Sequence, residues 1–264
     1  TAGTYSGLNT KTTIFNGTSW VINGNSMTNG GVDLYVNTNG ANVQLIASAN
    51  GRFYRVTANN NCTLTTIFTY TIAVATGKTA TIAAGTTYVY YYGGYPDLNI
   101  LGTVAGPGTV QVVFYDADRN ANFGTLWSAP LVVEASAAST GSRILSLAGT
   151  SSIASLVVDS AHAANTMTLS HGVNYRLTVS GATTIGTRGI MTQGTGTWTF
   201  TGGFVQNGAS SLFTQGGAIL IGSTGFSLSL GTFTGTTSYT VTDLGNFNKT
   251  GGTITDGVLN LVMN

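Results

Sequence analysis

The fold is decided by four short stretches near the end of the chain: "TWTFTGG" (residues 197–203), "FSLSLGTFTG" (226–235), "SYTVTDLG" (238–245) and "GTITDG" (252–257). Each joins a short segment of alternating apolar and polar residues to a corner that contains glycine. Alternation with a period of two indicates a β-strand, and glycine tolerates the backbone of a tight corner. From residue 165 onward such strand-and-corner units recur about every 8 to 12 residues, as imperfect copies of one another.

A β-solenoid has this organisation, because each coil needs apolar residues that point inward and small residues where the chain turns. From about residue 165 to residue 264 the chain resembles the loosely repeated β-helical passenger and adhesin-like regions of bacterial, archaeal and phage surface proteins. The resemblance is one of texture and rests on no diagnostic motif. We therefore expect residues 144–264 to form a glycine- and threonine-rich β-solenoid or a second β-sandwich.

The earlier part of the chain also reads as all-β. Strand-like segments such as "TSWVIN" (18–23) and "TVQVVFYD" (109–116) are separated by turn signals such as "NTNG" (37–40). Many short strands at this spacing predict an N-terminal antiparallel β-sandwich over residues 10–134. Residues 1–9 are expected to form a strand-like arm before it, and residues 135–143, which lack large apolar side chains, are predicted to be a linker.

The composition excludes several classes of function. Only 6% of the residues are charged, against a usual value of about 25%. The nine Lys and Arg residues form no cluster, so binding to nucleic acid is not expected. No run of 18 apolar residues is present, so no segment is expected to span a membrane. With a formal net charge of +1 there is little repulsion between copies, which favours self-association.

A tyrosine-rich segment is the most unusual local feature. Five of the 12 tyrosines lie between residues 88 and 95, and on one strand Tyr88, Tyr90 and Tyr92 share a face. With Tyr95 they would form either a subunit interface or a platform that binds glycans. Burial of that face in the core is the alternative, although each buried hydroxyl would then need a hydrogen-bond partner.

The segment "DADRNAN" (116–122) is a weak candidate for Ca²⁺. Asp116, Asp118, Asn120 and Asn122 occupy alternate positions, as in the first half of a calcium loop. The segment lacks the glycine and the bidentate glutamate of that loop, so a bound Ca²⁺ would be structural, with a Kd of order 10⁻⁴ M or weaker. A polar hairpin turn is the alternative.

No catalytic residue, no other cofactor and no enzyme are predicted. Asp243 and Asp256 could stack on successive coils as a carboxylate pair, but both lie in stretches typical of turns. His162 and His171 lack the spacing of a metal site or of a catalytic triad. The single cysteine, Cys62, forms no intrachain disulfide and is expected to be buried.

Three Asn-x-Ser/Thr sequons, at Asn16, Asn61 and Asn248, are candidates for glycosylation. Both chain ends are strand-like and suited to pairing at sheet edges.

Together these features predict an extracellular or cell-surface structural protein that self-assembles into a filament, sheath or surface array through aromatic or aliphatic faces and strand edges. One alternative is a phage or virion fibre or decoration protein that binds host glycans. The other is a carbohydrate-active β-solenoid enzyme.

Overall fold

The computed structural model of the protein describes residues 12–15, 19–23, 33–46, 55–65, 67–69, 72–85, 87–92, 98–99, 102–115, 118–122, 127–236, 238–255 and 260–263. In several strands before residue 127 only the backbone is described. Within these ranges every regular element is a β-strand and none is a helix.

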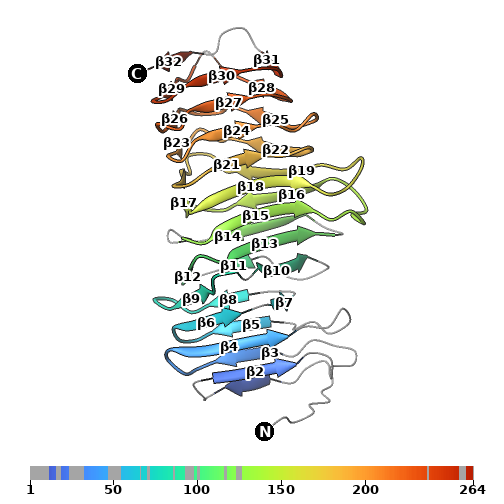
Figure 1. The fold of residues 1–264 in the computed structure, drawn as a ribbon, viewed down its shortest axis with the longest axis vertical. Coiled ribbons are helices and arrows are strands. Elements are labelled where there is room, and N and C mark those ends of the chain that lie inside the picture. The colour runs from blue at the N-terminus through green and yellow to red at the C-terminus, as the bar shows by residue number, and fades with distance from the viewer. Residues whose placement is uncertain are drawn as a thin grey trace.

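The strands stack along one axis into an elongated molecule, with the blue N-terminal strands at one end and the red C-terminal strands at the other (Figure 1). All strand pairings in the described ranges are parallel. The protein is therefore a β-solenoid, in which each turn of the chain adds one strand to each of the sheets that it passes through.

Three sheets form the middle and C-terminal parts. The nine-stranded sheet contains, in pairing order, β30 (Phe247–Lys249), β27 (Phe226–Leu228), β24 (Phe204–Gln206), β21 (Thr183–Ile185), β18 (Ser155–Ser160), β15 (Pro130–Ala135), β13 (Thr109–Phe114), β10 (Thr87–Tyr92) and β7 (Ile67–Thr69). The eight-stranded sheet contains β11 (Leu98–Asn99), β14 (Arg119–Asn122), β16 (Arg143–Leu147), β19 (Met167–His171), β22 (Gly189–Thr192), β25 (Leu212–Thr214), β28 (Thr232–Thr234) and β31 (Thr253–Thr255). The six-stranded sheet contains β17 (Ser151–Ile153), β20 (Leu177–Val179), β23 (Trp198–Phe200), β26 (Ile219–Ile221), β29 (Val241–Asp243) and β32 (Leu261–Met263).

Two further sheets lie in the N-terminal part. The four-stranded sheet contains β1 (Thr12–Phe15), β3 (Asp33–Val36), β5 (Arg55–Ala58) and β8 (Ile72–Val74). The five-stranded sheet contains β12 (Thr103–Ala105), β9 (Thr79–Ile82), β6 (Cys62–Thr65), β4 (Ala41–Ile46) and β2 (Ser19–Asn23).

From β17 onward the chain visits the six-, nine- and eight-stranded sheets in strict rotation. The first residues of β20, β23, β26, β29 and β32 stand in register, and their numbers, 177, 198, 219, 241 and 261, rise by nearly constant steps. In this part of the chain one turn therefore takes 20 to 22 residues and contains three strands. A strand with its corner is thus shorter than the 8 to 12 residues expected from the sequence.

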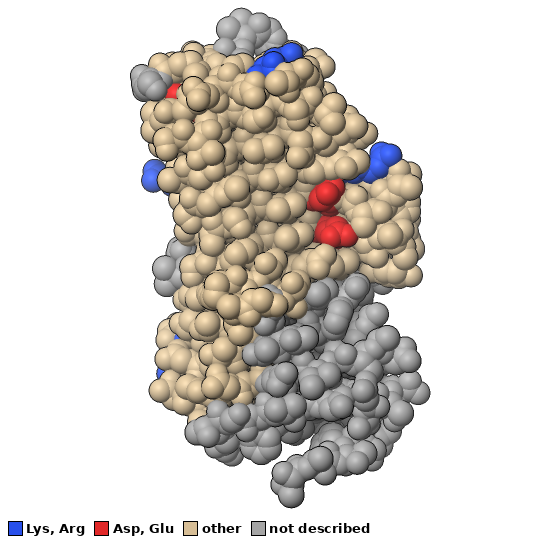
Figure 2. All heavy atoms as spheres, in the orientation of Figure 1, with Lys and Arg blue, Asp and Glu red and all other residues tan. Residues whose placement is uncertain are grey.

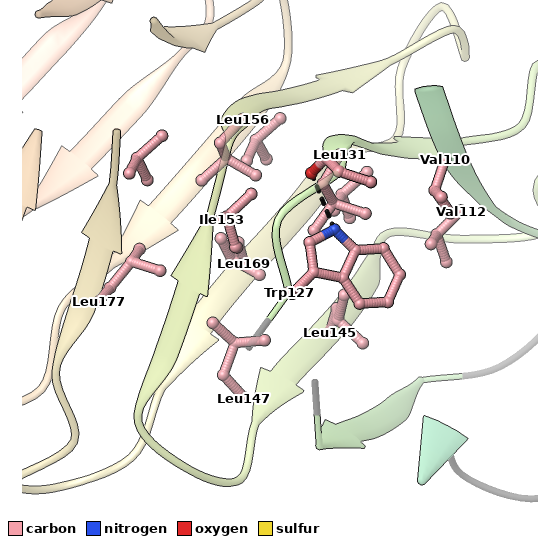
Figure 3. Close-up of a cluster of buried hydrophobic side chains, with 14 of the residues drawn as sticks. Val110, Val112, Trp127, Leu131, Leu145, Leu147, Ile153, Leu156, Leu169 and Leu177 are labelled. Atoms are coloured by element: carbon pink, nitrogen blue, oxygen red, sulfur yellow. Dashed lines mark hydrogen bonds between the residues drawn. The ribbon is translucent and has the colours of Figure 1, made fainter. Parts of the chain in front are cut away.

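Alternation along each short strand builds the core. In β23 the first and third residues, Trp198 and Phe200, are buried, and Thr199 between them is half-exposed. Larger side chains fill the middle of the solenoid, where Trp127 lies among Val112, Leu131 and Leu145 (Figure 3). The indole Nε1–H of Trp127 donates a hydrogen bond of 2.9 Å to the carbonyl oxygen of Ala129, which satisfies its polar atom in an apolar setting.

Aromatic rings continue the core toward the C-terminal end. Phe204, Phe226 and Phe247 are in register on neighbouring turns, and each successive pair of ring centroids is 5.2 Å apart. In the eight-stranded sheet, Phe213 and Phe233 stack at 4.9 Å with an interplanar angle of 6°. Register and side-chain packing thus specify the same alignment of turns.

Glycine is required where corners of successive turns touch. A Cβ atom at Gly208 would overlap the carbonyl oxygen of Gly186, one turn below. Gly225 has a φ of +85°, a conformation that residues with a side chain rarely adopt. At these two positions the glycines mark corners of the solenoid.

The structure confirms the all-β class and the solenoid of the C-terminal part, and it corrects the N-terminal prediction. The antiparallel sandwich expected over residues 10–134 is not supported, because the described strands of this part pair in parallel. The turn signal "NTNG" shows the physical reason. It connects β3 to β4, which belong to different sheets, and Gly40 has a φ of +74°. A hairpin and a solenoid corner need the same backbone conformation, so their residues look alike.

The predicted linker, residues 135–143, lies between β15 and β16. Parallel pairing continues past it, since β15 pairs with β18 along its whole length. The loop also contacts the next turn, where Asn165 Nδ2 donates a hydrogen bond of 2.9 Å to the Ser139 carbonyl oxygen. The division of the chain into domains remains a prediction.

Candidate interaction surfaces

The tyrosine-rich segment forms β10, inside the nine-stranded sheet between β7 and β13. Tyr88, Tyr90 and Tyr92 stand in register with three residues of β13 that are buried, Val110, Val112 and Phe114. The side chains of these tyrosines lie outside the described residues, as does the whole of Tyr95. Their role as an interface or glycan platform therefore remains a prediction.

Three of the four residues of the calcium candidate lie in or directly before β14. Asp118 is exposed, and its Oδ1 accepts a hydrogen bond of 3.0 Å from the backbone N–H of Ile144. Asn120 and Asn122 lie in β14, where only the backbone is described, and Asp116 lies outside the described residues. The strands on either side of the segment, β13 and β15, pair in parallel, so the alternative of a hairpin turn between them is wrong. Binding of Ca²⁺ remains a prediction.

Other metal sites have no support in the part of the chain that the structure describes. There, no three side chains of His, Cys, Asp or Glu lie together to hold a metal ion. Of the glycosylation candidates, Asn61 and Asn248 are exposed, and Asn16 lies outside the described ranges. The Oδ1 atom of Asn61 accepts a hydrogen bond of 2.9 Å from the N–H of Thr79.

The carboxylate of Asp243 binds backbone N–H groups of two neighbouring turns. It is completely buried, and its carboxylate accepts hydrogen bonds from the N–H groups of Phe226, at 3.3 Å, and Gly245, at 3.0 Å. These bonds fix a corner of its own turn and tie it to the turn below. Asp256, the other half of the carboxylate pair considered from the sequence, lies outside the described residues.

His171 is a further buried titratable group. Its Nδ1 accepts a hydrogen bond of 3.1 Å from the indole Nε1–H of Trp198, so Nε2 carries the proton and donates to the Gly149 carbonyl oxygen at 2.9 Å. Burial lowers the pKa of His171, which keeps the ring neutral. The contacts join three elements of the solenoid, and the exposed Tyr175 ring lies 5.6 Å from the imidazole.

His162 caps a turn. Its Nδ1 accepts hydrogen bonds from the backbone N–H groups of Ala164 and Asn165, both at 2.9 Å. This ring nitrogen therefore has its partners within the turn itself.

The structure brings together two carboxylates that the sequence did not pair. Glu134 in β15 and Asp159 in β18 are in register on adjacent strands and half-exposed. They lie far apart in the sequence, and only the length of this turn brings them into register. Gln111 Nε2 donates a hydrogen bond of 2.8 Å to Glu134 Oε2, and Asp159 Oδ1 accepts one of 2.7 Å from the N–H of Ser160.

Figure 2 shows few charged side chains on this side of the molecule. No family model, no curated protein and no solved structure matches the chain. In the described ranges, none of the elements is a helix of the length and apolar character needed to cross a membrane.

Proposed function

We propose that the protein is an extracellular structural protein whose copies assemble side by side into a filament, sheath or surface array. The observation that carries this proposal is a column of uncharged side chains on the outside of the nine-stranded sheet, here called the valine column. It runs along the long axis of the solenoid, and its members stand in register from turn to turn: Gln111, Val132, Val157, Thr184, Val205, Ser227 and Asn248.

The valine column is suited to packing against another flat surface. Val132, Val157 and Val205 are half-exposed, so each still has apolar area to bury. Complete burial of an exposed valine contributes about 1.5–3 kcal/mol, and half-exposed ones contribute part of this. Association itself costs about 4–15 kcal/mol in lost freedom of motion. A contact this narrow is weak alone, which favours an array in which each copy makes several contacts.

The charge distribution supports close approach of copies. The acidic residues nearest to the column, Glu134 and Asp159, lie at one end of their strands, where they would form the rim of a contact. With a net charge of +1 the whole chain produces little long-range repulsion. Pairing of strand edges, also expected from the sequence, would add to this lateral contact.

The test is negative-stain electron microscopy of the purified protein, combined with light scattering across a dilution series. The wild-type protein should form regular filaments or sheets. Thr184→Lys places a strongly hydrated charge in the middle of the valine column and should abolish them. Thr199→Lys is the matched control, because Thr199 is also the half-exposed middle residue of a three-residue strand, on another sheet.

Two outcomes would contradict the proposal. A wild-type protein that stays monomeric at every concentration would overturn self-assembly and favour the virion protein that binds glycans. Assemblies that form equally well with Thr184→Lys would show that the valine column is not the contact.

A further inference from the structure

We propose that the outer face of the eight-stranded sheet binds the surface of ice. The inference concerns five consecutive strands, β19, β22, β25, β28 and β31, and is independent of the assembly proposed above. Each strand turns two side chains outward, and we call the resulting set the threonine face. Its members are Thr168, Ser170, Ile190, Thr192, Leu212, Thr214, Thr232, Thr234, Thr253 and Thr255.

The threonine face is a regular two-column array. Strand register places Ser170, Thr192, Thr214, Thr234 and Thr255 in one column and the other five residues in the second. Neighbouring strands in a sheet are about 4.8 Å apart, and outward residues of one strand about 6.6 Å apart. The array therefore has five rows and two columns with nearly constant spacing.

Hydroxyl groups of neighbouring turns contact each other at both ends of the first column. Thr234 Oγ1 and Thr255 Oγ1 are 3.0 Å apart, within hydrogen-bond distance. One strand before the face, Ser146 and Ser170 repeat this contact at 3.2 Å. Threonine and isoleucine are also stiff at χ1, because two heavy atoms branch from Cβ. The array is thus held in place before any ligand arrives.

The side-chain types of the threonine face limit the kinds of ligand that it can bind. Eight of its ten residues carry a hydroxyl, two are aliphatic, and none is charged or aromatic. The lack of charge excludes recognition of phosphates or of an acidic polymer. The lack of aromatic rings removes the flat platforms on which sugar rings stack. What remains is a periodic array of methyl and hydroxyl groups, which fits a neutral lattice of hydrogen-bonding molecules.

Ice is such a lattice. The spacing between rows is close to the separation of second-neighbour oxygen atoms in ice, so one water molecule can repeat with each turn. Immobilising a water molecule at a protein surface costs up to about 2 kcal/mol, but water in ice is already immobile. Methyl groups also restrict the orientation of the water beside them. The ordered hydration of the face can therefore merge with the lattice, and each row adds to the binding.

The experiment is slow growth of an ice hemisphere from a solution of the full chain, followed by measurement of the protein fraction in the ice. The wild-type protein should be enriched in ice relative to an added protein that does not bind. Thr214→Lys, at the centre of the face, should lose this enrichment, as should Thr234→Lys. Thr199→Lys, on the six-stranded sheet, should keep it. Circular dichroism at the same temperature checks that each variant is folded.

Three results would overturn the inference. The wild-type protein could be excluded from ice, or both threonine-face variants could be enriched in ice as strongly as the wild-type protein. Thr199→Lys could also lose as much of the enrichment as the threonine-face variants do. Binding to microcrystalline cellulose that depends on Thr214, without enrichment in ice, would also overturn it in favour of a polysaccharide. Thr184→Lys separates the two proposals, because it should prevent assembly and leave enrichment in ice unchanged.

Discussion

Truncation of Phe226 should be among the most destabilising changes in the C-terminal part of the protein. Its side chain is completely buried, and its ring centroid lies 5.2 Å from Phe204, 5.3 Å from Phe233 and 5.2 Å from Phe247. Phe226→Ala removes these contacts and leaves a cavity between turns. We expect the free energy of unfolding to fall by about 3–5 kcal/mol, as in other buried Phe→Ala changes.

Phe247→Ala is the matched comparison, one turn further along the same column. Phe247 is only partly buried, and among the described aromatic residues its ring contacts that of Phe226. Loss of a half-buried side chain should lower the free energy of unfolding by about 1–2 kcal/mol. Phe226→Leu keeps most of the side-chain volume and should lower the free energy of unfolding by about 1.5 kcal/mol, well below the effect of Phe226→Ala.

Urea denaturation followed by far-ultraviolet circular dichroism measures these differences. Because a solenoid can unfold turn by turn, a weakened middle turn can also divide the urea unfolding transition into two separate steps. Limited proteolysis would then locate cleavage near Phe226. Equal effects of Phe226→Ala and Phe247→Ala would refute the reasoning, because the core would not then be the column of stacked rings described above.

Three further predictions concern titratable groups. Burial lowers the pKa of His171 below its ordinary value of 6.5, so the unfolded chain takes up a proton first as the pH falls. The contribution of neutral His171 to the free energy of unfolding is therefore fully present above about pH 6.5 and decreases below it. Lowering the pH from 7.5 to 5 should reduce the urea midpoint by less in His171→Gln than in the wild-type protein. An equal reduction in both proteins would contradict this. Glu134→Gln removes one of two like charges in register, Glu134 and Asp159, and should raise the free energy of unfolding by about 0.2–1 kcal/mol at low salt, measured by urea denaturation. A decrease would show that the Glu134 charge is stabilising. Burial raises the pKa of the Cys62 thiol to about 12, so a thiol reagent at pH 8 should label the protein only after unfolding, as mass spectrometry would detect. Rapid labelling of the folded chain would place Cys62 at the surface.

Much of the local structure follows directly from the sequence. Alternation in "TWTF" and "TFTG" predicts strands with one buried face, and β23 and β28 have that pattern of burial. The glycines after these strands predict corners, as the structure shows. Local sequence is sufficient here because a strand and a corner are each decided by a few neighbouring residues.

The direction of strand pairing could not be predicted in the same way. In the N-terminal part, "NTNG" suits a hairpin between antiparallel neighbours, but it forms a corner between two sheets. The pair Glu134 and Asp159 also escaped prediction, because it depends on the length of the turn that separates them. Turns before β20 vary in length, so no fixed period reveals which residues become neighbours.

The sequence by itself determined that this protein is all-β, nearly uncharged, and built from short strands with glycine corners. Only the tertiary structure decided that the strands pair in parallel, that three units make one turn, and that side chains one turn apart form the columns on its surface. The physical reason is that alternation and turn chemistry act within a few residues. Register instead depends on contacts between turns, such as the ring of Phe226 against that of Phe247.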